Sequence, residues 1–232
     1  MPSSTSHKQS APTTFALVPL VICPTQLGIP SSTTTVPEST HIAVNVAPVS
    51  ASSVAIYSDS GGIMRLIAPR GWVCSGSDNA DGSGEVVVYP PTQGLPSSWR
   101  EGKWRLSSNS TAEAVVGMET SACVGCTLEQ ACTIFPSAAR SLLRQYDFSC
   151  QPARPEKELL FRITANMVSF EDPAGVAGEG VPSGGKYPAD GVVTYYPHDP
   201  NGSYLETCTL PPSERDICIA SLNAFLDEYG NQ

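Results

Sequence analysis

The segment Cys123-Val-Gly-Cys126 has the spacing of a redox-active dithiol. In thioredoxin-like oxidoreductases a strand and a short loop lead into CxxC at the start of a helix, and the helix N-terminus lowers the pKa of the first thiol. Cys132 and Cys150 follow closely and offer both thiols other partners, and no β-α-β pattern precedes the motif. We therefore interpret the four cysteines as structural disulfides. A thiol-disulfide oxidoreductase and a zinc site are the alternatives.

A second group of reactive side chains lies in and just after a Gly/Pro-rich connection that runs from residue 171 to residue 191. Carboxylates and a histidine that converge could serve a hydrolase, although the sequence has no G-x-S-x-G, H-E-x-x-H or S-x-x-K motif. Tyrosines nearby would equally suit a binding surface. Long irregular connections often carry function, so we expect any site here. The candidate residues are Glu171, Asp172, Tyr187, Tyr195, Tyr196, His198 and Asp199.

The segment from Trp99 to Trp104, WREGKW, predicts a hairpin with Glu101-Gly102 at its tip. Trp99 and Trp104 would then lie opposite each other on neighbouring strands. We interpret them as a structural pair. The alternative is an aromatic platform for a sugar or an anionic polymer.

Alternating and β-branched patterns predict the elements that must hold these residues. Helical patterning covers about 128–146, interrupted at Pro136, and a final helix starts at Ser213 as N-cap. The fold class predicted is α+β, with a β-rich antiparallel or mixed sheet, two to three helices and disulfides. The predicted strands are His41–Val49, Val54–Tyr57, Ile63–Ala68 after a Gly61-Gly62 turn, Glu85–Tyr89, Ala112–Met118, Glu158–Phe170 and Gly191–Tyr196; the buried stripe of the last helix is Ile219, Leu222, Phe225, Leu226 and Tyr229.

The eight cysteines are even in number in a chain of low charge, which is typical of four disulfides. From their proximity in the sequence we predict that Cys208 is bonded to Cys218 across a Pro-Pro turn. Cys23 and Cys74 are the two cysteines of the N-terminal half, and we predict that they are bonded to each other. The other four are left to pair among themselves. Residues 1–14 are rich in Ser, Thr and Pro and predict a disordered linker. Residues 15–232 predict one globular domain.

Only 15% of the residues are charged, and the net charge is −9. A chain with this net charge does not attract the negatively charged backbone of a nucleic acid. We therefore expect no nucleic acid partner. The longest apolar run, Phe15 to Ile22, is far shorter than the roughly 20 residues that span a bilayer. We expect a secreted or cell-surface protein without cofactor or metal, whose partner is a cell-envelope or extracellular ligand.

Several segments together resemble a group of exported actinobacterial proteins of unknown function. They are PRGW-x-C at 69–74, C-x-x-C-x5-C at 123–132, DPAGVAGEGVPSGG at 172–185 and the last helix with its two cysteines. The resemblance covers most of residues 15–230. It implies export and a single domain, and it implies no activity. A non-catalytic binding or cell-envelope domain is the functional expectation.

Overall fold

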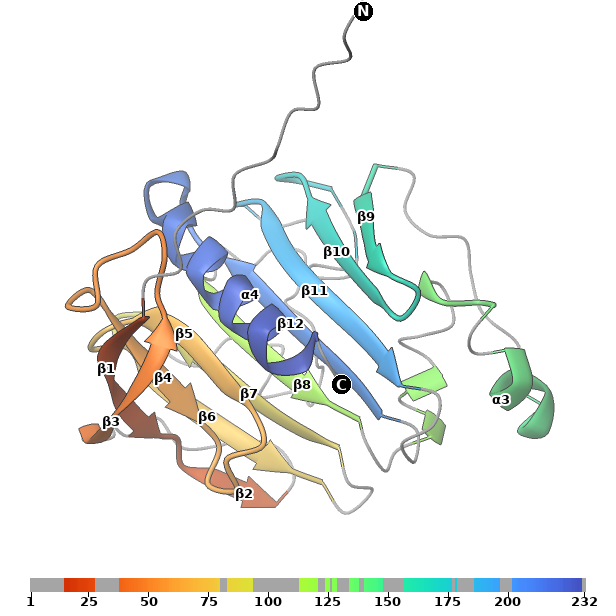
Figure 1. Ribbon diagram of the computed structural model, residues 1–232, viewed down its shortest axis with the longest axis horizontal. Coiled ribbons are helices and arrows are strands. Elements are labelled where there is room, and N and C mark those ends of the chain that lie inside the picture. The colour runs from red at the N-terminus through yellow and green to blue at the C-terminus, as the bar shows by residue number, and fades with distance from the viewer. Residues whose placement is uncertain are drawn as a thin grey trace, which may run out of the picture.

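The computed structural model (Figure 1) describes residues 15–27, 38–79, 83–93, 113–120, 124–125, 127–128, 134–137, 140–147, 157–176, 178, 186–196 and 202–230. Its strands are β1 (Phe15–Ile22), β2 (Thr25–Leu27), β3 (Glu38–Asn45), β4 (Val54–Ser58), β5 (Arg65–Pro69), β6 (Val73–Asp78), β7 (Gly84–Tyr89), β8 (Ala114–Glu119), β9 (Leu159–Thr164), β10 (Met167–Asp172), β11 (Ala189–Tyr196) and β12 (Gly202–Thr209). Its helices are α3 (Arg140–Gln145) and α4 (Arg215–Tyr229), and the 3-10 turn η1 (Pro212–Glu214) leads into α4.

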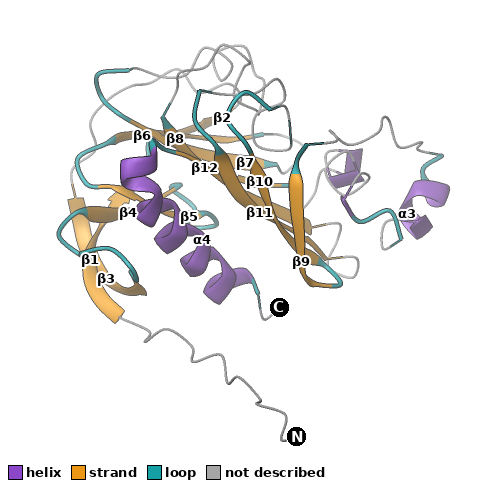
Figure 2. Cartoon of the chain, turned by 90° about the horizontal axis from the view of Figure 1, so that it is seen from above, coloured by secondary structure: helices purple, strands orange, loops and turns teal. Residues whose placement is uncertain are grey.

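The strands form two sheets. The larger has eight strands in the order β2-β6-β7-β8-β12-β11-β10-β9, with a parallel β2–β6 pair beside antiparallel neighbours. The smaller has four strands in the order β3-β1-β4-β5, with a parallel β1–β4 pair. The β-rich mixed architecture is confirmed. Helix content is lower than predicted, because η1 with α4 is the one long helical segment among the described residues and the short α3 lies apart from the sheets (Figures 1 and 2).

The four-stranded sheet and α4 lie together on one face of the eight-stranded sheet (Figure 2). α4 packs against β5, β11 and β12, while β4 and β5 pack against β7 and β8. β7 is buried on both faces of the large sheet: Val86 and Val88 face this layer, and Val87 belongs to a buried cluster on the opposite face. A continuous run of β-branched residues is typical of a strand that is covered on both sides.

Two disulfides join this layer to the large sheet, as predicted. Cys23, directly after β1, is bonded to Cys74 in β6, and Cys218, in the first turn of α4, is bonded to Cys208 in β12. Such bonds persist in oxidising compartments, so they indicate an extracytoplasmic environment. None of the helices in the described part of the chain is long and apolar enough to cross a membrane.

The two disulfides lie in one transverse row of the large sheet. Cys74 in β6 is paired with Val88 in β7, Val88 with Val115 in β8, and Val115 with Cys208 in β12. All four side chains belong to the same buried cluster. The covering layer is therefore covalently attached at both ends of a single row of residues.

The start of α4 differs from the prediction. Ser213 is not its N-cap, because η1 occupies residues 212–214 and Glu214 precedes α4 without a side-chain capping bond. Pro211 and Pro212 explain the difference, since the fixed φ of proline suits the first position of a helical turn.

The buried face of α4 agrees with the predicted stripe except at Ile219, since Leu222 and Leu226 are partly buried and pack against the core. Phe225 and Tyr229 are buried as expected, but Ile219 is 41% exposed. Ile217 and Cys218 are buried in its place. The disulfide accounts for the burial of Cys218, because it joins this side of the helix to β12.

The segment predicted as one strand over Glu158–Phe170 is two strands, β9 and β10, which form an antiparallel hairpin. Ala165 and Asn166 make the turn between them. The predicted Gly61-Gly62 turn joins β4 to β5, and Gly62 has the positive φ, 74°, that favours glycine.

Gly191 in β11 permits a close approach between strands. A Cβ at this position would overlap the Phe170 ring and fall 2.7 Å from the Glu206 carbonyl oxygen. We expect Gly191→Ala to lower the free energy of unfolding by about 1–3 kcal/mol, because a rigid ring and a backbone atom cannot move aside. Gly202→Ala is the matched control, since its Cβ would meet Tyr204 at an ordinary 3.8 Å. Urea denaturation measures both, and equal losses would contradict the explanation.

Candidate functional site

Glu171 and Asp172, the acids predicted to share a site, point to opposite faces of the large sheet. Glu171 accepts a hydrogen bond from the Arg215 guanidinium at 3.0 Å, at the start of α4. Asp190 accepts two more from the same guanidinium, at 3.0 and 3.1 Å. Burial raises the pKa of Asp190, and the hydrogen bond from Arg215 opposes that shift. This cluster attaches the start of α4 to β10 and β11.

Asp172 is buried on the other face, against Gly178 of the long connection. Its partner in β11 is Ala189, which lies six residues before Tyr195 and on the same face. Six residues of strand span about 20 Å. Tyr195 is therefore far from both carboxylates, and Glu171, Asp172 and Tyr195 are not brought together.

The tyrosines serve separate parts of the structure. Tyr195 is buried, and its ring stacks on Phe135 with 6.1 Å between centroids. Tyr196 faces α4 and donates a hydrogen bond to the Tyr229 carbonyl oxygen. Tyr187 has the Lys186 ammonium 4.8 Å from its ring centroid.

The remaining predicted site residues, His198, Asp199, Trp99, Trp104, Cys123, Cys126, Cys132 and Cys150, lie outside the described residues. β8, which precedes the Cys-Val-Gly-Cys segment, pairs antiparallel with both β7 and β12. A thioredoxin-like unit requires a parallel β-α-β crossover beside the motif, so this part of the sheet does not favour the oxidoreductase alternative.

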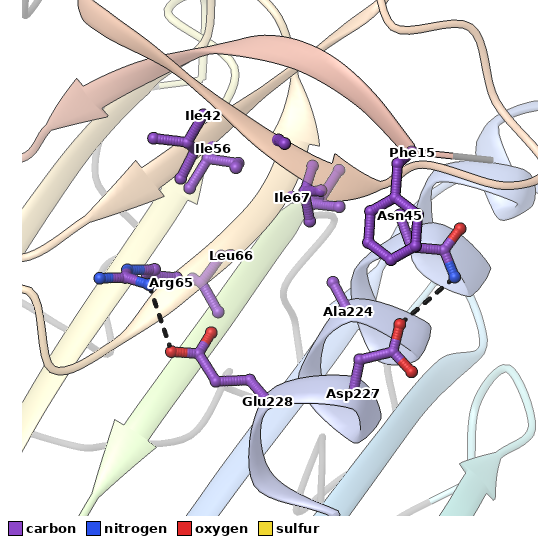
Figure 3. A pocket seen from close by; sticks show the side chains of 12 residues that line it. Phe15, Ile42, Asn45, Ile56, Arg65, Leu66, Ile67, Ala224, Asp227 and Glu228 are labelled. Atoms are coloured by element: carbon purple, nitrogen blue, oxygen red, sulfur yellow. Dashed lines mark hydrogen bonds and ion pairs between the residues drawn. The ribbon is translucent and has the colours of Figure 1, made fainter. Parts of the chain in front are cut away.

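The candidate site that the structure does offer lies between the four-stranded sheet and α4 (Figure 3). It is an open groove of about 580 Å³. Its walls are mainly apolar, and Phe15 at its edge is 68% exposed. The residues that give it this character are Phe15 from β1, Ile42 and Val44 from β3, Ile56 from β4, Leu66 and Ile67 from β5, and Ala224 from α4.

Charged groups are confined to two places in the groove (Figure 3). The Arg65 guanidinium lies 3.5 Å from the Glu228 carboxylate. Asn45 donates a hydrogen bond of 3.3 Å to the carboxylate of Asp227. Burial raises the pKa of Glu228, and the charge of Arg65 opposes that shift. The groove thus combines an apolar floor with a small polar cluster, the arrangement typical of sites for small molecules.

No pattern in the sequence predicts this groove. Its walls come from β1, β3, β4, β5 and α4, which only the tertiary fold brings together. One local signal was available: Asp227 and Glu228 fall in the last turn of the helix, where the helix dipole disfavours acids and where no basic residue lies. Acids in that position suggest a role other than helix stability.

The comparisons with known proteins found nothing similar. No family model, no curated protein and no solved structure matches the chain. The groove is accordingly interpreted from its own geometry and chemistry.

Proposed function

We propose that this chain is a non-catalytic extracytoplasmic binding domain, secreted or held at the cell envelope, whose ligand occupies the groove between the four-stranded sheet and α4. The groove itself carries the proposal. Its volume of about 580 Å³ lies within the range of small-molecule sites, roughly 300–1,000 Å³, and its walls are mainly apolar. We do not propose a hydrolase, because the side chains of Glu171 and Asp172 lie apart from each other and from Tyr195. The resemblance to exported actinobacterial proteins stays a prediction.

Binding of a neutral apolar fluorophore, N-phenyl-1-naphthylamine, tests the proposal. We expect saturable fluorescence enhancement by the wild-type protein. Ala224→Phe should weaken that binding at least tenfold, because the new ring would fill the groove from the α4 side. Ile219→Phe is the matched control, since Ile219 lies on the same helix but is exposed outside the groove.

A second variant keeps the proposal testable if Ala224→Phe fails to fold. Val44→Thr nearly preserves volume but places a hydroxyl on the groove wall, and we expect severalfold weaker binding. Circular dichroism should show both variants folded. Absence of saturable binding to the wild type, or equal binding by Ala224→Phe and Ile219→Phe, contradicts the proposal.

A further inference from the structure

The two charged places in the groove carry unequal numbers of positive and negative groups. Asp227 and Glu228 contribute two carboxylates, whereas Arg65 contributes the single positive charge among the lining residues. Figure 3 shows both acids on adjacent positions of α4, directed toward the strands. Among the lining residues two negative charges thus stand against one positive charge, which is bound to Glu228.

The end of α4 adds to this negative potential. A helix C-terminus carries the equivalent of roughly half a negative charge, which acts within its last turn. Asp227 and Glu228 lie in that turn, and α4 ends at Tyr229. Both acids are unfavourable for the helix there; each has a partner on the strands, Arg65 for Glu228 and Asn45 for Asp227, and a positive ligand group would also meet this negative potential.

The net charge of the whole chain also favours a positively charged ligand. Its net charge of −9 attracts cations over the distance of a Debye length, and the low-dielectric walls of the groove strengthen interactions inside it. The apolar residues Ile42, Val44 and Ile56 line the same groove as the two acids. Apolar surface and negative charge are thus offered to one ligand.

We propose that the groove binds a small cationic amphiphile, with its apolar body against Ile42, Val44 and Ile56 and its amine or guanidinium group beside Asp227 and Glu228. This inference rests on the proposed function, since it specifies the ligand of the same groove. It adds the charge of the ligand and the residues that select it.

Three probes of equal length test this inference at pH 7, below their aggregation concentrations: decylamine, decanol and decanoate. Their affinities are measured by displacement of N-phenyl-1-naphthylamine. We expect decylamine to bind at least tenfold more tightly than decanol, and decanoate to bind more weakly than decanol. The preference for decylamine should shrink at high salt, because the acids are partly exposed.

Variants separate the acid pair from the charge of the whole chain. Asp227→Asn with Glu228→Gln should abolish the preference, lowering the affinity for decylamine to about that for decanol in the same variant. Glu214→Gln with Asp216→Asn removes two acids at the other end of α4, and the preference should persist. Arg65→Gln should increase the preference severalfold, since the acids lose their positive neighbour.

The outcomes distinguish the two proposals. Equal binding of decylamine and decanol overturns the inference about charge and leaves the groove as a binding site. Equal loss of preference in both double variants also overturns it, because the effect would then come from net charge. Failure of all three probes and of the fluorophore overturns the proposed function itself.

Discussion

At pH 9, Glu206→Gln is expected to unfold with a free energy roughly 4 to 5 kcal/mol higher than that of the wild type, whereas at pH 4 the two proteins should be about equally stable. Glu206 lies in β12 and is fully buried. Burial raises its pKa to about 8; the Ser221 hydroxyl opposes the shift, and the Glu228 carboxylate adds to it. The folded protein therefore holds a proton that the unfolded chain releases near pH 4.5.

The direction of the pH dependence follows from this difference between the folded and unfolded pKa of Glu206. Because the folded state binds the extra proton, stability is greatest below the unfolded pKa and falls as the pH rises toward about 8. Glutamine is neutral throughout and removes this decline. Urea denaturation of both proteins between pH 4 and pH 9 measures the effect, and a stability difference that does not change with pH would contradict it.

Glu85 provides an internal comparison for the Glu206 result. Burial raises its pKa to about 7, with the Ser77 hydrogen bond opposing the shift. Glu85→Gln should therefore gain less, roughly 3 kcal/mol, and its gain should level off near pH 7. The gain of Glu206→Gln should continue to grow until about pH 8.

Removal of the disulfide between Cys23 and Cys74 is expected to lower the free energy of unfolding by about 4 kcal/mol. Its loop spans 51 residues, whereas the loop between Cys208 and Cys218 spans 10. A longer loop restricts the unfolded chain more, so the second disulfide should contribute only about 3 kcal/mol. Double cysteine-to-alanine variants, compared by urea denaturation, measure both values.

The order of the two losses is the informative result. All four cysteines are buried, so the small cavity left by each alanine should affect both variants alike. If the 208–218 variant loses more stability than the 23–74 variant, the stabilisation does not come from loop closure. The attachment of α4 to β12 would then be the larger contribution.

Continuous β-branched residues made some strands predictable, although β1, the longest apolar run of the chain, was not among the predicted strands. The β7 strand was predicted because Val86, Val87 and Val88 are β-branched residues, which favour a strand. The β12 strand was not predicted because its buried positions include Glu206 and Thr207. Polar residues of these types are usually exposed, and only the tertiary fold shows that they are covered. β6 was not predicted for the same reason, since its buried positions include Ser75 and Ser77.

The candidate site was harder to predict than the fold. Glu171 and Asp172 appeared to form a pair because they are adjacent, yet neighbours in a strand face opposite sides of a sheet. The predicted strand ended at Phe170 and so hid this alternation. The groove depends on Arg65 and Glu228 meeting across 163 positions of sequence, which follows only from how α4 docks.

The row that contains both disulfides determines how the domain would carry a mechanical load. Tension applied at β1 passes through Cys23 into Cys74, and tension applied at the end of α4 passes through Cys218 into Cys208. Between Cys74 and Cys208 the load crosses β7 and β8 at right angles to the strands, along the direction of their hydrogen bonds. Bonds pulled in that direction at one row separate one after another. Under tension we therefore expect the large sheet to peel apart between β6 and β12, and the groove to open under the same load, because β1 and α4 are two of its walls.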